Sequence, residues 1–168
     1  LLGVAISANA IAYGLSKFLM GGVSDRSSAR KFLPLGLTLS ALTTLILGTR
    51  AGLSSVVSMF ILQFLIGWFQ GMGWPPSGRV MTHWFSQHER GTKMSIWNVA
   101  HNVGGALIGP MAAVGMAWFG SWQAGTFWFP AIVALVIVVI AYLLIRDTPQ
   151  SCGLPPIEQY RNDYPPNY

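Results

Sequence analysis

Long stretches of the chain carry no charged side chain, and their lengths set the number of elements. Uncharged runs cover residues 32–49, 51–78 and 94–145, and the first 24 residues contain one charged group, Lys17. A helix needs about 20 apolar residues to cross a bilayer, so the last run has room for two helices and a turn. Glycine and polar residues interrupt that run at 119–123 and predict the turn there. We therefore expect five membrane spans, at about residues 1–23, 32–48, 54–78, 92–119 and 123–145.

Composition agrees with a lipid environment. Charged residues make up 9% of the chain, against about 25% in soluble domains. The predicted fold class is therefore an all-α membrane protein, a bundle of five transmembrane helices. This composition argues against a soluble globular core. The single cysteine, Cys152, provides neither a disulfide framework nor a cysteine metal cluster, and we expect a free cytosolic thiol.

The basic residues of the loops predict the orientation in the membrane. One side carries Arg26, Arg30, Lys31, Arg79, Arg90, Lys93, Arg146 and Arg161, whereas the other side carries Arg50 alone. Short loops rich in Lys and Arg stay in the cytoplasm, so the first side is the cytoplasmic one. Leu1 then lies on the outer side without an initiator Met or signal peptide, and we expect at least one upstream span to be missing. The net charge of +5 belongs mostly to the inner loops and requires no nucleic-acid partner.

After the last predicted span the sequence becomes polar and rich in proline. Residues 147–168 contain the run Thr-Pro-Gln-Ser-Cys-Gly-Leu-Pro-Pro and end in a Tyr/Asn/Pro tail. Such a composition is typical of a linker. We expect this segment to be the start of a cytoplasmic linker, following a transmembrane unit at residues 1–146.

A small set of polar residues inside the spans forms the candidate site. Asn9, Tyr13 and Lys17 are spaced by four and share one helical face. In the fourth span, a second polar face consists of Asn98, His101, Asn102 and Gly105. Lys17 lies eight residues before Asp25, and His101 lies eight residues after Lys93, so each lies roughly 12 Å from a charged boundary. A cation at that depth usually faces a water-filled cavity, and this pair could hold an anion through charge-assisted hydrogen bonds.

Packing is the competing interpretation for several of these residues. Asn9, Tyr13 and Asn98 could bond between helices without touching a ligand. The pairs Gly67/Gly71 and Gly105/Gly109 have the spacing that lets helices approach closely, and we expect a structural role for them. Pro75 and Pro76 predict a kink or a local break in the third span.

Other chemistries have little support in the sequence. The segment at 71–78 is rich in glycine, but it lacks the Lys-Ser/Thr ending of a phosphate-binding loop and has no preceding strand, so no nucleotide site is expected. His83, His88 and His101 lack the spacing of a helical zinc pair, so no metal site is predicted. The spans contain no carboxylate pair for acid and base catalysis, which leaves an intramembrane enzyme as a remote alternative. No cofactor is expected.

Several motifs carry a resemblance to a known family. Residues 21–31 (Gly-Gly-Val-Ser-Asp-Arg-Ser-Ser-Ala-Arg-Lys) and Glu89-Arg90-Gly91 resemble loops of major facilitator superfamily transporters, although Val23 and Ala29 depart from the common pattern. Four segments, at 11–18, 67–79, 97–105 and 146–158, are more specific and resemble the organophosphate:phosphate antiporters of that superfamily. The resemblance runs over essentially the whole chain. It implies part of the N-terminal helical bundle, helices two to six, and the start of the central loop.

The resemblance also implies a function and the residues that carry it. It maps the substrate cavity onto Tyr13, Lys17, Trp74, Trp97, Asn98 and His101, and a cytoplasmic gate onto Asp25, Arg26, Glu89 and Arg90. The principal phosphate-binding arginines of the family lie on helices one and seven, which the resemblance places outside this chain together with the C-terminal half. The implied activity is exchange of glycerol 3-phosphate for inorganic phosphate by alternating access in a bacterial inner membrane. A hexose-phosphate transporter, a channel and a transporter-like sensor of phosphate esters remain as alternatives.

Overall fold

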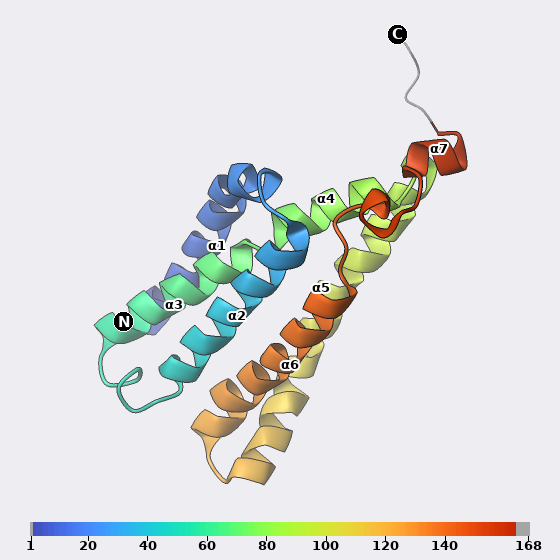
Figure 1. The fold of residues 1–168 in the computed structure, drawn as a ribbon. Coiled ribbons are helices and arrows are strands. Elements are labelled where there is room, and N and C mark those ends of the chain that lie inside the picture. The colour runs from blue at the N-terminus through green and yellow to red at the C-terminus, as the bar shows by residue number, and fades with distance from the viewer. Residues whose placement is uncertain (1, 164–168) are drawn as a thin grey trace.

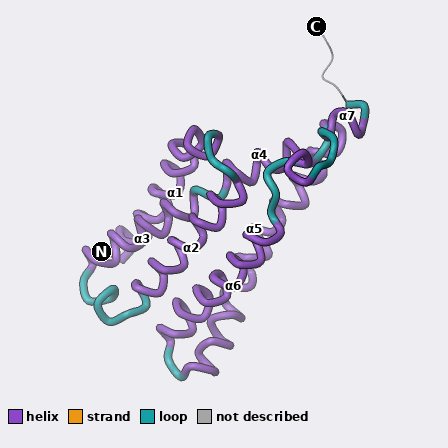
Figure 2. The backbone as a smooth tube through the Cα atoms, viewed as in Figure 1, coloured by secondary structure: helices purple, strands orange, loops and turns teal. Residues whose placement is uncertain are grey.

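The computed structural model describes residues 2–163, and the elements found there are helical (Figures 1 and 2). The helices are α1 (Leu2–Asp25), α2 (Ala29–Leu47), α3 (Val56–Gly71), α4 (Trp74–Trp84), α5 (Gln87–Phe119), α6 (Phe129–Leu144) and α7 (Ile157–Arg161), with a π-helix η1 (Ala124–Trp128) and a 3-10 helix η2 (Pro149–Cys152). Five of these stretches are long and apolar enough to cross a membrane, as predicted, and α3 and α4 together form one of them. The all-α membrane fold is therefore confirmed.

Helices α1 and α3 pack closely because small residues line the contact. Four buried positions of α1, at Ala5, Ala8, Ala12 and Ser16, have the three- and four-residue spacing of one helical face. On α3, a methyl group at Gly67 would collide with the backbone of Asn9, and one at Gly71 would lie 2.8 Å from the Tyr13 carbonyl oxygen. The structural role predicted for this glycine pair is confirmed. In contrast, Gly105 and Gly109 have no atom of residues 2–163 that a side chain would meet, and their role stays a prediction.

The third span is interrupted at its middle. Helix α3 ends at Gly71, and α4 begins at Trp74 with prolines in its first turn, where a missing N–H costs no hydrogen bond. The break expected at Pro75 and Pro76 is therefore present. The span continues to Trp84, six residues beyond the predicted end at 78, because the helix restarts after the break instead of stopping there.

Helices α5 and α6 form a hairpin beside the α1–α3 group (Figure 1). Helix α5 ends at Phe119, and Gly120 adopts the left-handed conformation that favours glycine, with φ 69°. The turn falls at Gly120 and Ser121, within the region 119–123 where the sequence predicts it, and the chain then returns through η1. Gly115 and Gly125 face each other across this hairpin, and a methyl group on Gly115 would lie 2.8 Å from the Gly125 Cα.

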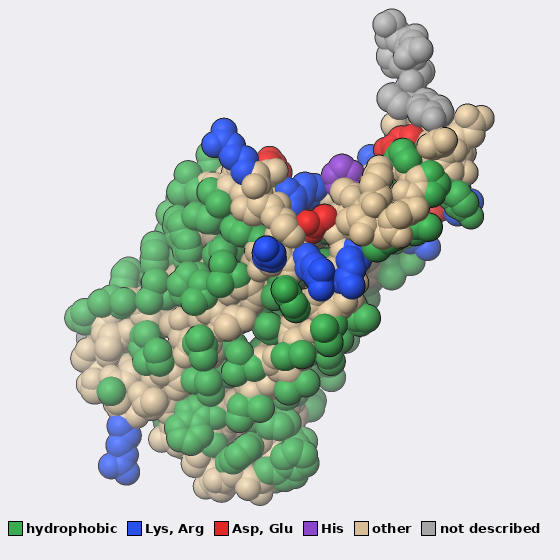
Figure 3. All heavy atoms as spheres, viewed as in Figure 1, with side chains coloured by type: hydrophobic (Ala, Val, Ile, Leu, Met, Phe, Trp, Pro, Cys, Tyr) green, Lys and Arg blue, Asp and Glu red, His purple; other side chains and the backbone are tan. Residues whose placement is uncertain are grey.

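Charge and apolar surface are divided along the bundle as the loops predict. Apolar side chains cover most of the visible outer face, and most Lys and Arg side chains gather at one end (Figure 3). Arg50 lies in the loop between α2 and α3, at the other end. Many large apolar residues are exposed, for example Phe18 and Leu144 at 86% and 75%, as expected where lipid covers them.

The segment after α6 has more structure than its composition suggests. It contains η2 and α7, and it lies beside the N-terminal end of α5 (Figure 1). Thr148 caps η2 by accepting a hydrogen bond from the Ser151 N–H, and Gly153 ends it with φ 76°. Local caps of this kind order short turns in proline-rich chains.

Candidate functional site

A cavity of about 880 Å³ opens between the helices of the bundle. Its lining comes from α1 to α5 and from the α3–α4 break, and includes Asn9, Tyr13, Ser40, Gln70, Trp74, Ser77, Trp97 and His101. A second cavity of about 200 Å³ adjoins Trp74, Trp97, Asn98, Ala100 and His101. Volumes of this order suit small ligands.

Two aromatic rings hold the ammonium group of Lys17. Its Nζ lies 4.0 Å from the centre of the Tyr13 ring and 4.2 Å from the centre of the Trp74 ring. Tyr13 is one helical turn before Lys17 on α1, and Trp74 is the first residue of α4. Both contacts are cation–π interactions, which stabilise a partly desolvated cation. We call these three side chains the lysine cage.

Hydrogen bonding and ring packing fix the aromatic members of the lysine cage. The indole N–H of Trp74 donates to the Tyr13 hydroxyl. The ring of Trp97, from α5, meets the Trp74 ring edge to face, with centroids 4.6 Å apart and an interplanar angle of 82°. The lysine cage thus comes from α1 and α4, and Trp97 of α5 packs against it. Trp74 reaches Lys17 because the helix restarts at Trp74 after the break that follows Gly71.

His101 and Asn98 lie on α5. His101 lines both cavities, and Asn98 lines the smaller one. Both side chains are exposed in the region that the structure describes. Tyr13, Trp74 and Trp97 border the same cavity as His101. The structure therefore brings members of both predicted polar faces to one space, although Lys17 and Asn102 border neither cavity.

Sequence reasoning passed over several polar groups of the cavity. Gln70 and Ser77 border it from α3 and α4, and Ser40 borders it from α2. Gln63 accepts a hydrogen bond from the Asn9 amide at 3.3 Å, which supports the packing interpretation of Asn9. The signal in the sequence was the pair of side-chain amides at Gln63 and Gln70, seven residues apart inside an otherwise apolar span.

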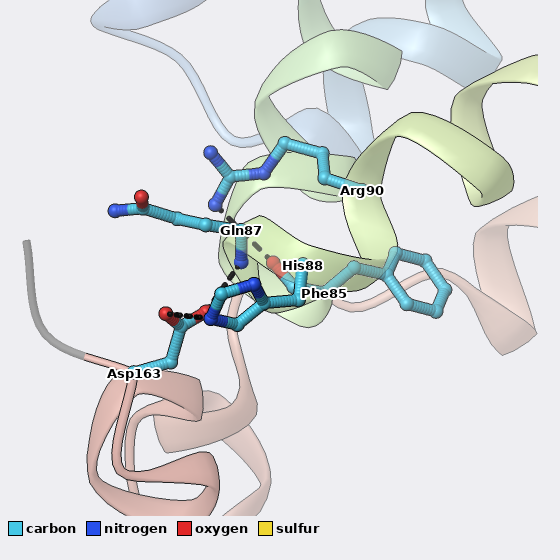
Figure 4. Close-up of polar contacts among 5 residues, drawn as sticks. All are labelled: Phe85, Gln87, His88, Arg90 and Asp163. Carbon is cyan, nitrogen blue, oxygen red and sulfur yellow. Dashed lines mark hydrogen bonds and ion pairs between the residues drawn. The ribbon is translucent and has the colours of Figure 1, made fainter.

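The four residues assigned to a cytoplasmic gate do not form one cluster in this chain. Glu89 pairs with Arg161, with 2.6 Å between Oε1 and Nη2. Arg90 donates to the carbonyl oxygen of Thr82 and to that of Phe85, and Figure 4 shows the contact with Phe85. Asp25 and Arg26 form no ion pair with any group in residues 2–163. The gate role remains a prediction.

Arg79 and Asp147 hold together the helix ends at which most basic residues lie, and no sequence pattern indicated this. The Arg79 guanidinium donates to the carbonyl oxygens of Ser24 and Asp25 at the end of α1 and of Ser27 just after it, at 2.6, 3.0 and 2.5 Å. Asp147, just beyond α6, accepts the Arg30 backbone N–H at 2.8 Å in the first turn of α2.

The surroundings of Asp147 lower the pKa of its carboxyl group. Burial alone would raise this pKa, because it disfavours the charged form. The hydrogen bonds from the Ser28 side chain and the backbone N–H groups of Arg30 and Ala29, together with the charge of Arg79, outweigh burial and lower the pKa. Asp147, which follows α6 in the sequence, therefore acts as a charged cap for the N-terminal end of α2.

The five long apolar helices define a multi-pass membrane protein, and comparison with known proteins gives its family. A family model described as Major Facilitator Superfamily matches residues 1–161. The chain belongs to this superfamily.

Individual relatives narrow the similarity further. The chain is 59% identical over 165 residues to the "Glycerol-3-phosphate transporter" of Bacillus subtilis (strain 168) and 51% identical over 179 residues to that of Haemophilus influenzae, covering 98% and 99% of this chain. It is 43% identical, over 96% of its length, to a "Probable hexose phosphate transport protein" of Chlamydia trachomatis. The chain spans 37% of the length of the first two relatives and 34% of the third.

Proposed function

We propose that the complete protein carrying this chain exchanges external glycerol 3-phosphate for internal inorganic phosphate across the bacterial inner membrane. The two glycerol-3-phosphate transporters share 59% and 51% of aligned residues with this chain, compared with 43% for the hexose-phosphate protein. This difference favours the smaller substrate. The protein acts as a secondary transporter with one site that opens alternately to each side, and not as an enzyme.

The observation that carries the proposal is the lysine cage. Its two rings, Tyr13 and Trp74, line the larger cavity, and the Lys17 ammonium lies against both rings without itself bordering that cavity. A phosphate monoester carries roughly −1.5 to −2 charge at neutral pH, and within residues 2–163 no carboxylate lies within 4.0 Å of the Lys17 ammonium. The ammonium is therefore held in place by rings while its charge stays available to an anion. His101 and Asn98 add hydrogen-bonding groups from α5, and Tyr13, Trp74 and Trp97 provide aromatic surface in the same space.

Exchange follows from a site that binds both anions through the phosphoryl group. Glycerol 3-phosphate and inorganic phosphate share that group, so Lys17 serves either ligand. If the empty site changes sides slowly, outward movement of one anion must accompany inward movement of the other. We further propose that Asp25, Arg26, Glu89 and Arg90 contribute to the cytoplasmic gate, with partners from the part of the protein beyond this chain.

Parallel uptake measurements test the proposal. Vesicles containing the complete protein and loaded with phosphate should take up labelled glycerol 3-phosphate much faster than labelled glucose 6-phosphate. Preferred uptake of glucose 6-phosphate would assign the protein to hexose phosphates instead. Flux without internal phosphate would indicate a channel, and saturable binding without flux would indicate a sensor; either result overturns the antiporter proposal.

A further inference from the structure

The short helix α7 and the residue pair that follows it contact the N-terminal end of α5 (Figure 4). One carboxylate oxygen of Asp163 accepts the backbone N–H of Gln87 at 2.6 Å, and the other lies 3.4 Å from His88 Nε2. The Asp163 side chain is 9% exposed, although His88 is 89% exposed. Asp163 is therefore buried against the first turn of a helix that lies more than 70 residues earlier in the sequence.

Helix α5 lacks a cap of its own at this end. The residue at its N-cap position, Ser86, makes no side-chain hydrogen bond to the helix. The first turn of a helix leaves backbone N–H groups without partners, and a carboxylate placed there also interacts favourably with the helix dipole. Asp163 supplies both interactions from outside the helix.

The conformation of α7 presents two side chains to α5 together. Asn162 ends α7 in the left-handed conformation, with φ 51°, and the Asp163 N–H donates to the Glu158 carbonyl oxygen at 3.0 Å. This turn directs Asp163 to Gln87, while Arg161 pairs with Glu89 at 2.6 Å. Two contacts, made by residues two positions apart in each segment, fix the position of α7 better than one contact would.

We propose that residues 157–163 form a latch that docks on the first turn of α5 and caps it through Asp163. The latch connects the segment after α6 to the helix that carries Trp97, Asn98 and His101. Arg161 of the latch also forms an ion pair with Glu89. The Glu89 carboxylate is therefore not available for a different ion pair while the latch is docked. Undocking of the latch frees the first turn of α5.

Hydrogen exchange at the start of α5, in the complete protein in lipid nanodiscs, tests the latch. Asp163→Ala should raise the exchange rates of the amides at residues 87–90 by about 2- to 30-fold, the factor expected for loss of a helix cap. Asp163→Asn keeps an acceptor oxygen but loses the charge, so its effect should be smaller. Gln159→Ala is the matched control, because Gln159 is exposed and its side chain makes no hydrogen bond within the described region. Equal exchange rates in Asp163→Ala and Gln159→Ala would overturn the proposal.

A double-mutant cycle tests the second contact. Glu89→Gln and Arg161→Gln should each raise exchange at residues 87–90 by about 1.4- to 5-fold, the range for a partly exposed ion pair. The double variant should then match a single variant, because the second substitution removes a partner that is already lost. Multiplied effects in the double variant would show that Arg161 does not pair with Glu89. Hydrogen exchange does not depend on transport, so a failed transport assay leaves this test intact.

Discussion

Lys17 shows how a single charged side chain is kept inside a membrane bundle. Its ammonium lies 4.0 and 4.2 Å from the centres of two aromatic rings, and it has no carboxylate partner in the part of the chain that the structure describes. A carboxylate partner would neutralise the group and compete with an incoming anion. The rings stabilise the charge without competing for it as an ion-pair partner.

Replacement of Lys17 should weaken both proposed ligands together. Lys17→Ala removes a charge-assisted interaction of about 1.5–3 kcal/mol, so the Kd values for glycerol 3-phosphate and inorganic phosphate should each rise by about 10- to 160-fold. Binding to the purified complete protein, measured by calorimetry, provides the test. Arg50→Ala removes one positive charge from the far loop and should leave both Kd values within about twofold. Unchanged affinity for both anions in Lys17→Ala would remove this residue from the site.

Trp74 should act through Lys17, and a graded series of variants tests this. Trp74→Leu removes the ring under the ammonium, the donor to Tyr13 and the partner of Trp97, so we expect about 3- to 30-fold weaker phosphate binding, from loss of a cation–π contact and a hydrogen bond. Tyr13→Phe keeps its ring and loses the hydroxyl alone, with an expected effect of about 2- to 10-fold. In a Lys17→Ala background, Trp74→Leu should add little. A full additional loss in that background would mean that Trp74 touches the ligand independently of Lys17.

At the scale of elements, the contact between α1 and α3 sets the position of the site. Gly67 and Gly71 let the α3 backbone reach α1 at Asn9 and Tyr13, and Ser16 donates to the Trp68 carbonyl oxygen at 2.5 Å. The start of α4, and with it Trp74, then falls beside Tyr13. A wider separation of the two helices would move Trp74 away from Lys17.

A methyl group at Gly71 should therefore destabilise the protein. Gly71→Ala places a carbon 2.7 Å from the Ser16 Cβ and 2.8 Å from the Tyr13 carbonyl oxygen, and overpacking of this kind costs about 1–3 kcal/mol. Gly14→Ala is the matched control, because a side chain at Gly14 meets nothing within 4 Å, and alanine there should be neutral or stabilising by up to about 1 kcal/mol. Thermal unfolding in lipid nanodiscs compares the two. Equal stability of both variants would show that α1 and α3 are less tightly packed than described.

The Asp147 cap gives stability with a defined pH dependence. Its pKa is lowered in the folded protein, so the unfolded state binds more protons as the pH falls. The stabilisation is fully present above the ordinary aspartate pKa of about 3.9 and is lost as the pH falls through the lower, folded-state pKa. Hydrogen exchange in the first turn of α2 should therefore rise relative to Asp147→Asn as the pH is lowered from 5 towards 2, after correction for the intrinsic pH dependence. A wild-type to variant ratio that is constant over this range would contradict the role of the charge.

The sequence predicts the elements better than the contacts between them. Uncharged runs set the five spans, and Pro75 and Pro76 located the break in the third, since both depend on local chemistry. Spacing by four also placed Tyr13 beside Lys17. The approach of Trp74 to Lys17, the Arg79 contacts and the Asp147 cap join residues more than 50 positions apart. They depend on helix packing, which no local pattern encodes.

At the scale of the whole molecule, we propose that this chain supplies one wall of a site. It spans 37% of the length of the glycerol-3-phosphate transporters to which it is similar, and His101 and Asn98 on α5 are exposed. Alternating access requires a second group of helices that moves against the first. The proposed activity therefore belongs to the complete protein, and this chain contributes the lysine cage and the polar face of α5.

The most direct test of the proposed antiport measures both anions in one experiment. Proteoliposomes of the complete protein, loaded with phosphate carrying one label and supplied with glycerol 3-phosphate carrying another, allow uptake and efflux to be measured together. For an antiporter, glycerol 3-phosphate should enter only as phosphate leaves, in a fixed ratio. Lys17→Ala should reduce both fluxes by the same factor. Entry of glycerol 3-phosphate without efflux of phosphate, or fluxes that Lys17→Ala leaves unchanged, would contradict the proposal.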